Sequence, residues 1–271
     1  MHQYLKYTPS TVKRLIRRTV RRFGWELSHF NPGSSEWAQV KKFLDLESVT
    51  TVLDVGANRG QYAKNIRDAG FRGKIISMEP GSEAHQFLTR AAAGDPLWQI
   101  LPPIAIGSQD GFVELNVSGN SGESSSILPI LSASTEAMPQ SGYVATERVP
   151  LAMLDTIAKQ YLNNVDGPIF LKLDVQGFES EVLKGAAQVL TKVAGLQVEL
   201  SLVPLYEGQL LFNEMIEMLI GLGFELWSLI PGFVNQNTGR LLQVDGLFSR
   251  RTIENRVAKG LTSQKPITSR R

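Results

Sequence analysis

Short runs of β-branched and apolar residues alternate with helical patterns through most of the chain. The sequence predicts strands at 50–55, 74–78, 99–106, 112–117, 169–173 and 196–202, and helices at 61–69, 83–93, 150–161, 179–193 and 213–222. Two further runs at 224–229 and 241–249 flank a turn-rich segment and predict a terminal antiparallel strand pair. This alternation favours an α/β fold with a doubly wound, mainly parallel sheet.

Length and composition limit the class of protein further. The chain has 271 residues, of which 42% are hydrophobic, enough for one substantial core. It has no cysteine, which excludes disulfides, thiolate zinc sites, iron–sulfur clusters and a cysteine nucleophile. No apolar run is long enough to cross a membrane or to resemble a secretory signal, so we expect a cytoplasmic protein.

The two ends of the chain are basic and the part between them is acidic. Residues 1–24 carry seven Lys and Arg and no acid, and residues 250–271 carry seven with one Glu. Residues 25–249 hold 14 basic and 25 acidic residues. We therefore expect a basic amphipathic helical extension at 1–47, one domain at 48–249 and a flexible basic tail at 250–271.

The basic start predicts a helix that opens at Ser10. Its apolar residues share one face and its arginines the other; the apolar set is Val12, Leu15, Ile16, Val20, Phe23 and Leu27. Such a helix either packs on the domain or makes peripheral contact with the inner face of a membrane through residues 10–27. Nucleic acid is not an expected partner, because the acidic body repels a polyanion.

The first strand ends in Asp54-Val-Gly-Ala-Asn-Arg-Gly60, whose glycines permit a tight turn and a close approach to a ligand. The third glycine of a dinucleotide fingerprint is missing, and Asp54 puts a carboxylate where a pyrophosphate needs positive charge. The second strand ends in Glu79, where an acid typically accepts hydrogen bonds from ribose hydroxyls. A nucleoside with a cationic group and no phosphate fits both acids, and S-adenosylmethionine is such a molecule.

The later strand ends supply an apolar wall and more acids. Residues 104–107 are small and apolar, suited to an adenine ring or to ordinary core. The pleat places Lys172 and Asp174 on one face of their strand, as a site or as a plain ion pair, and Glu199 lies among apolar neighbours. The loop 118–143, rich in Ser, Gly and Pro, is either a substrate loop or a disordered insertion. No histidine lies at a strand end, so a histidine base is not indicated.

The order of these motifs resembles the FkbM family of methyltransferases. The resemblance rests on 54–60, Glu79-Pro80, 105–107, the serine-rich 120–126, Lys172-x-Asp-Val-x-Gly-x-Glu179 and Glu199. It implies a class I, Rossmann-like fold with seven strands, the last antiparallel, over residues 48–249. It also implies S-adenosylmethionine-dependent methyl transfer to a hydroxyl of a sugar, in a glycolipid or glycosylated metabolite, or of a polyketide-like acceptor. Gln176 stands where the family usually has Glu, which weakens any proposal of a divalent metal site.

The resemblance also implies a role for individual residues. The cofactor would be bound by Asp54, Gly56, Ala57, Asn58, Gly60, Tyr62, Glu79, Pro80, Ala105 and Ile106. The acceptor would contact Ser124, Ser125, Ser126, Gln176 and Glu179. Asp174 is the expected general base, with Lys172 or Glu199 orienting it.

Two other functions stay open on the sequence. One is a nicotinamide-dependent oxidoreductase, which the missing glycine and Asp54 disfavour. The other is a membrane-peripheral binding protein that keeps the fold without turnover, suggested by the basic amphipathic start.

Overall fold

The computed structural model describes residues 9–26, 29–162 and 165–250. In this part of the chain the main sheet has seven strands, in the spatial order β3 (Trp98–Ile100), β2 (Lys74–Met78), β1 (Thr51–Val55), β7 (Ile169–Leu173), β8 (Val193–Ser201), β10 (Gln243–Arg250) and β9 (Phe224–Pro231). The first five are parallel neighbours, whereas β10 is antiparallel to β8 and β9. The doubly wound, mainly parallel seven-stranded sheet with its terminal antiparallel pair is therefore confirmed.

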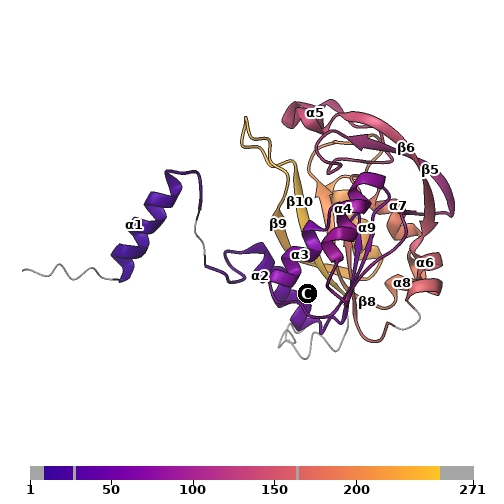
Figure 1. Cartoon of the computed structure of the whole chain (residues 1–271), viewed down its shortest axis with the longest axis horizontal. Helices are drawn as coiled ribbons and strands as arrows, with labels where there is room; N and C mark the ends of the chain where they lie inside the picture. The colour runs from indigo at the N-terminus through magenta and orange to yellow at the C-terminus, as the bar shows by residue number, and fades with distance from the viewer. Residues whose placement is uncertain (1–8, 27–28, 163–164, 251–271) are drawn as a thin grey trace, which may run out of the picture.

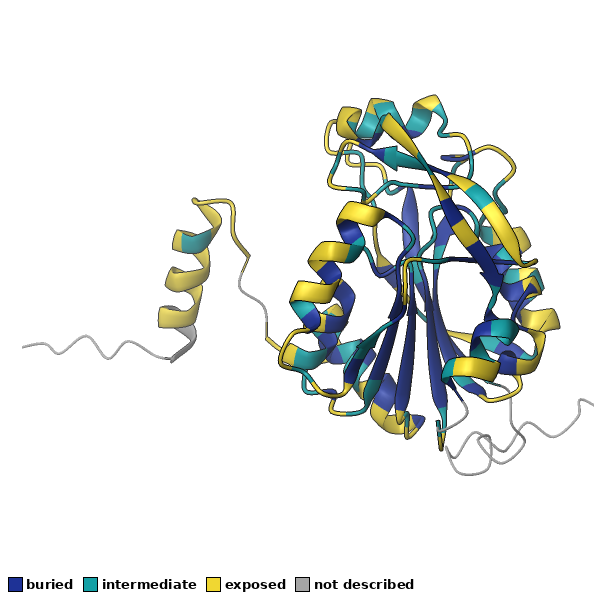
Figure 2. Cartoon of the chain, turned by 45° about the vertical axis from the view of Figure 1, so that its right-hand side comes forward, coloured by how far each residue is buried: buried dark blue, intermediate teal, exposed yellow. Residues whose placement is uncertain are grey.

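Helices cover both faces of this sheet, and the strands between them are buried (Figures 1 and 2). One face packs against α2 (Glu36–Leu46), α3 (Gln61–Asp68) and α4 (Ser82–Ala92). The other packs against α6 (Leu154–Tyr161), α7 (Glu179–Lys184), α8 (Ala187–Leu190) and α9 (Phe212–Gly221). Successive strand residues point to opposite faces, so Val52 joins the first core and Leu53 the second. This explains why the central strands are continuous apolar runs.

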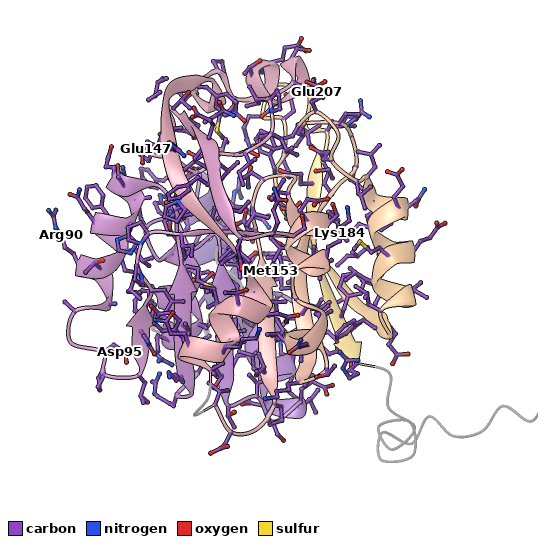
Figure 3. All side chains as sticks on the ribbon, turned by 90° about the vertical axis from the view of Figure 1, so that its right-hand side faces the viewer. Arg90, Asp95, Glu147, Met153, Lys184 and Glu207 are labelled. Carbon is purple, nitrogen blue, oxygen red and sulfur yellow. The ribbon has the colours of Figure 1, made fainter. Side chains whose placement is uncertain are left out.

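A second, smaller sheet lies beside the main one. In the described residues it has three strands, in the order β4 (Ala105–Gly107), β6 (Tyr143–Met153) and β5 (Gly111–Ser118). Figure 3 shows Glu147 on β6 above α4, where its carboxylate accepts hydrogen bonds from the backbone N–H and hydroxyl of Ser82. The sequence predicted the short extra strand at 112–117 but not its partner β6.

Three predicted elements are corrected by the structure. The strand predicted at 99–106 is divided into β3 and β4, because Pro102 and Pro103 have no N–H to continue a ladder. The helix predicted at 150–161 begins only at Leu154, since 150–153 complete β6. The helix predicted at 179–193 is two short helices, α7 and α8, separated at Gly185. A Cβ at Gly185 would lie 1.9 Å from the carbonyl oxygen of Gly107, so β4 crosses there at very short range.

The loop 118–143 is folded, so its interpretation as a disordered insertion is wrong. It contains α5 (Ser132–Ala137) and a short 3₁₀ turn, η1 (Pro139–Ser141). Its serine-rich part returns to β5 through two backbone hydrogen bonds between Asn116 and Ser126, of 2.9 and 3.1 Å.

The amino-terminal helix α1 (Pro9–Arg21) begins one residue before the predicted start and lies apart from the rest of the molecule (Figure 1). Its side chains at Val12, Leu15 and Ile16 are exposed rather than packed on the domain. By contrast α2, which also falls in the predicted extension, buries Val40 and Phe43 against the sheet. Leu27 and the predicted tail beyond Arg250 lie outside the described residues. None of the described helices is long and apolar enough to cross a membrane.

Candidate active site

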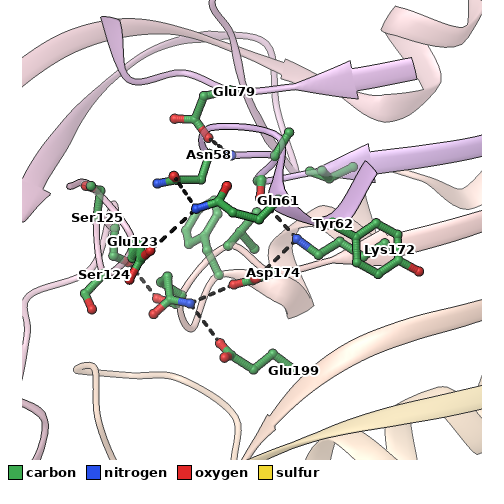
Figure 4. Close-up of a pocket in the computed structure, with 18 of the residues that line it drawn as sticks. Asn58, Gln61, Tyr62, Glu79, Glu123, Ser124, Ser125, Lys172, Asp174 and Glu199 are labelled. Atoms are coloured by element: carbon green, nitrogen blue, oxygen red, sulfur yellow. Dashed lines mark hydrogen bonds and ion pairs between the residues drawn. The ribbon is translucent and has the colours of Figure 1, made fainter. Parts of the chain in front are cut away.

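A cavity of about 440 Å³ opens at the carboxyl ends of β1, β2 and β7. Residues of β8 and β10 also line it, together with the amino-terminal end of α2 and the serine-rich part of loop 118–143. Figure 4 shows labelled side chains from the ends of β1, β2 and β7, from β8 and from the serine-rich part of the loop gathered around one space. This is the edge of the sheet at which the sequence predicts the ligand site.

The turn after β1 brings the backbone of Gly56 directly against the end of β7. Gly56 has a φ of +75°, and a Cβ there would lie 1.8 Å from the carbonyl oxygen of Asp174. Only glycine fits this position, since any side chain would overlap the neighbouring strand end. The same loop continues through Ala57 and Asn58, both in the cavity lining, to Gly60 at the start of α3. This cradle fits a ligand that contacts the backbone closely, as the cofactor implied by the sequence would.

Glu79, at the end of β2, ties the two strand ends together. Its carboxylate accepts hydrogen bonds from the backbone N–H groups of Asn58 and Gly81, each at 2.8 Å. Burial raises the pKa of Glu79 to about 7, although these two hydrogen bonds act in the opposite direction. Each oxygen accepts one bond here and has room for another, so the carboxylate can also accept ribose hydroxyls. Pro80, Ala105 and Ile106 line the cavity beside it.

Lys172 lies between two carboxylates on adjacent strands. Its Nζ is 3.6 Å from Oδ1 of buried Asp54 and 3.2 Å from Oδ2 of Asp174, and it donates a hydrogen bond of 3.1 Å to the carbonyl oxygen of Gly56. Burial lowers the pKa of Lys172, but the charges of Asp174 and Asp54 outweigh burial and raise it. Lys172 is therefore a permanent cation that fixes Asp174 rather than a proton acceptor.

Asp54 is completely buried below this cluster and does not line the cavity. Its Oδ2 accepts a hydrogen bond of 3.0 Å from Ser77, while Oδ1 faces Lys172 without a hydrogen-bond partner among the described residues. Burial raises the pKa of Asp54, and the charge of Lys172 opposes that rise. Asp54 therefore has only an indirect effect on the cavity. Its carboxylate faces Lys172, and it lies two residues before the turn at Gly56.

Gln176 connects the carboxylates of Asp174 and Glu199. Its Nε2 donates hydrogen bonds to Asp174 at 2.7 Å and to Glu199 at 3.0 Å, and its Oε1 accepts one of 2.6 Å from the hydroxyl of Tyr206. Burial and the charges of Asp174 and Glu179 raise the pKa of Glu199 well above its usual value. A neutral amide thus separates two acids that would otherwise face each other directly.

The three predicted loop serines line the cavity, but their hydroxyls mostly hold the loop itself together. Ser126 donates a hydrogen bond of 2.7 Å to the carbonyl oxygen of Gln176. Ser124 accepts one from Asn120 and Ser125 one from the backbone N–H of Ser118. The structure therefore joins this loop to the end of β7 through Ser126.

Glu179, predicted to contact the acceptor, lies under the turn instead. It is buried, it does not line the cavity, and its Oε1 accepts hydrogen bonds from the backbone N–H groups of Val175 and Gly177. Burial raises the pKa of Glu179 to about 7. Its direct contribution is to the shape of the turn that carries Gln176.

Several cavity residues were missed by the sequence reasoning. Asp245 on β10 is paired in register with Glu199, and Gln197 with Lys172, so polar side chains continue across the sheet. Burial raises the pKa of Asp245 to about 6. The alternation of polar Gln243 and Asp245 with apolar neighbours could have revealed this row. Tyr206 comes from the connection after β8 and has no comparable sequence signal. Among the described residues, no group of three or more acids or histidines is arranged to bind a metal ion.

Known proteins with similar sequences point to one family. The sequence model described as the methyltransferase FkbM domain matches residues 54–226, well over half of the chain. The 2-O-methyltransferase NoeI of Sinorhizobium fredii (strain NBRC 101917 / NGR234) is 27% identical over 188 residues, which cover 66% of this chain and 74% of NoeI.

Solved structures with a similar fold are more distant. The magnesium protoporphyrin IX methyltransferase ChlM of Synechocystis PCC 6803, with bound SAM, matches with a TM-score of 0.43 and 10% identity over 93% of this chain and 87% of that chain. A SAM-dependent methyltransferase of Aquifex aeolicus matches with a TM-score of 0.40 and 16% identity over 90% and 98%. On the family match, the chain belongs to the FkbM methyltransferases and is an S-adenosylmethionine-dependent methyltransferase.

Proposed function

We propose that this methyltransferase acts on a hydroxyl group of a sugar, in a glycolipid or glycosylated metabolite, or of a polyketide-like acceptor. The observation that carries the proposal is the position of Asp174. Its side chain is 37% exposed at the cavity, and it is fixed on one side by Lys172 and on the other by Gln176. A relative named as a 2-O-methyltransferase supports transfer to oxygen.

The cofactor region is the part of the cavity near β1 and β2. Glu79 would accept the ribose hydroxyls, the Gly56–Asn58 backbone would contact the amino-acid part, and Ala105 and Ile106 would pack on the adenine. When bound, S-adenosylmethionine supplies an electrophilic methyl group on a cationic sulfur. The acids that line this cavity suit a cationic ligand and disfavour a phosphate.

Asp174 accepts the proton that the acceptor hydroxyl loses during transfer. A hydroxyl is a weak nucleophile, so a carboxylate within hydrogen-bond reach increases its reactivity. Lys172 keeps the carboxylate in place without donating its own proton, because the charges around it favour the ammonium form. Most of the remaining acceleration would come from holding the acceptor oxygen in line.

Glu199 and Asp245 have a different role in this proposal. Burial raises the pKa of Glu199 and so favours the protonated form of its carboxyl group, in which it would donate a hydrogen bond to an acceptor oxygen. Asp245 lies beside it in register and offers a second polar contact. A molecule with several adjacent hydroxyls, such as a sugar, makes the best use of such a row of donors and acceptors.

The proposal is tested with methyl-labelled S-adenosylmethionine and the purified full-length protein. Glycolipid, glycan and small-metabolite fractions from cells that lack the protein serve as acceptors, and mass spectrometry locates the added methyl group. We expect a product one CH₂ heavier, with the methyl group on oxygen. A methyl group on nitrogen or carbon, or label in no fraction, would overturn the proposal.

Family membership decides against the nicotinamide-dependent oxidoreductase considered from the sequence. The same labelling experiment distinguishes the enzyme from a binding protein that keeps the fold without turnover. Such a protein would bind S-adenosylmethionine in a calorimetric titration but label no fraction.

A further inference from the structure

Helix α1 presents an apolar face that nothing in the described structure covers. Val12, Leu15 and Ile16 lie on the same side of the helix and are exposed, with Leu15 61% exposed. Figure 1 shows α1 standing apart from the domain that contains α2. A helix of 13 residues is marginally stable alone in water, and packing its apolar face on a partner supplies most of its stability.

The opposite side of α1 is strongly basic. Residues 12–26 carry six basic side chains: Lys13, Arg14, Arg17, Arg18, Arg21 and Arg22. A single acid in this stretch, Glu26, is paired with Arg21 through a hydrogen bond of 2.9 Å. The partner of this helix must therefore combine an apolar interior with a negatively charged surface.

Aromatic side chains extend the apolar surface beyond the helix. Phe23 is 77% exposed, Trp25 is 72% exposed, and Phe30 is also exposed. Trp and Phe favour the boundary between the headgroups and the acyl chains of a bilayer. An apolar face, flanking arginines and exposed aromatic residues together match a helix that lies in this boundary.

We propose that α1, with the exposed aromatic side chains of Phe23, Trp25 and Phe30, binds the surface of an anionic lipid bilayer. The apolar face enters the acyl boundary, and the basic residues contact the lipid headgroups. Residues 25–249 hold 14 basic and 25 acidic residues, so the positive charge that attracts an anionic surface is concentrated in the helix rather than in the body. Nucleic acid would satisfy the basic residues but has no apolar interior to cover Val12, Leu15 and Ile16.

The placement has a consequence for the active site. Glu36 and Trp37, in the first turn of α2, line the cavity only six residues after Phe30. A helix lying on a membrane would therefore bring the cavity near the lipid surface. If the proposed hydroxyl methylation is correct, the acceptor that best fits this position is lipid-linked.

The test is sedimentation of the full-length protein with two kinds of vesicle. One contains phosphatidylcholine alone, and the other contains equal parts of phosphatidylcholine and phosphatidylglycerol. We expect binding to the mixed vesicles and much weaker binding to phosphatidylcholine. The measurement needs neither cofactor nor acceptor, so its result is independent of the proposed methyl transfer.

Two pairs of variants make the test specific. Leu15→Ser should release the protein from the mixed vesicles, whereas Val144→Ser, which changes an apolar residue 72% exposed on β6, should not. Arg14→Gln should weaken binding about five-fold, the effect expected for one charge at an anionic surface. Lys64→Gln, on the exposed side of α3, should leave binding unchanged. Since α1 stands apart from the domain, the thermal midpoints of Leu15→Ser and Arg14→Gln should match that of the original protein. Those of Val144→Ser and Lys64→Gln should match it as well, because both side chains are exposed.

Three results would overturn the proposal. The first is equal sedimentation of the original protein with and without mixed vesicles, or of Leu15→Ser and the original protein. The second is binding to an RNA duplex that Arg14→Gln weakens and Leu15→Ser leaves intact, which would identify a nucleic-acid site. The third is a dimer in lipid-free buffer that Leu15→Ser converts to a monomer, which would make a second copy of the chain the partner.

Discussion

The amide of Gln176 donates a hydrogen bond of 3.0 Å to the carboxyl group of Glu199, although the two side chains come from different segments of the sheet edge. The same nitrogen also donates to Asp174, and the hydroxyl of Tyr206 fixes the amide from the other side. Because an amide cannot ionise, it binds both acids without adding a third negative charge. This arrangement holds the side chains of Asp174 and Glu199 on one amide at short range.

Replacing the amide of Gln176 by a carboxyl group should change the electrostatic interaction between Asp174 and Glu199. In Gln176→Glu a third carboxyl group lies between Asp174 and Glu199, and like charges raise the pKa of one another. We expect the acidic limb of the kcat/KM profile to move to higher pH, with lower activity at neutral pH. The pH profile of both forms checks this, and an unchanged limb or one at lower pH would contradict it.

Tyr206→Phe serves as the control for this variant. It removes the hydroxyl that orients the amide but adds no charge. It should lower kcat without moving the acidic limb.

Asp174→Asn should remove the proposed proton acceptor while keeping the size of the side chain. We expect kcat to fall by at least about 100-fold, the usual contribution of a general base. The dissociation constant for S-adenosylmethionine, measured by calorimetry, should stay near that of the original protein. Asp68→Asn, on the exposed side of α3, is the matched control and should be fully active. Retained turnover in Asp174→Asn would show that another group accepts the proton.

Much of this site was predictable because parallel strands end at one common edge. Asp54, Glu79, Asp174 and Glu199 lie far apart in the sequence, yet each follows or lies in a predicted strand, and all four gather at the carboxyl edge. The strand runs were predictable for the same reason, since burial on both faces leaves an apolar signal.

The remaining parts depend on contacts that leave no local pattern. Tyr206 reaches Gln176 from a connection without regular periodicity. Strand β6 contains exposed polar residues and Pro150, and its pairing with β5 joins segments separated by the loop 118–143. Glu179 was assigned to the acceptor by its place in a motif, whereas the structure turns it toward the backbone of Val175 and Gly177.

The close approach of Gly56 and Asp174 predicts a large stability effect. Gly56→Ala should lower the free energy of unfolding by about 3 kcal/mol, because overlap with the Asp174 carbonyl adds to the cost of a positive φ. Gly94→Ala measures the cost of a positive φ alone, since Gly94 has a φ of +92° and nothing lies within 4 Å of an added Cβ. The free energy of unfolding of Gly94→Ala should fall by only about 1 kcal/mol. Urea denaturation measures the free energy of unfolding of both variants. Equal losses would show that the backbone at Asp174 moves away from the added methyl group at no cost.

Buried Glu179 predicts how stability depends on pH. Burial raises its pKa to about 7 in the folded protein, against about 4.3 in an unfolded chain. Between these values the folded state binds more protons, so the free energy of unfolding decreases as pH rises, by at most about 1.4 kcal/mol per pH unit for one group. The contribution of Glu179 is therefore complete below about pH 4.3 and is lost as pH rises through about 7.

Glu179→Gln removes this dependence and keeps an oxygen that accepts from Val175 and Gly177. Urea denaturation between about pH 5 and about pH 7 should therefore give a shallower decline than the original protein shows. The other acids whose pKa values burial raises would account for the slope that remains; they are Asp54, Glu79, Glu199 and Asp245. Glu217→Gln, on the exposed side of α9, should keep the original slope. Parallel slopes for Glu179→Gln and the original protein would mean that this carboxyl group does not take up a proton on folding.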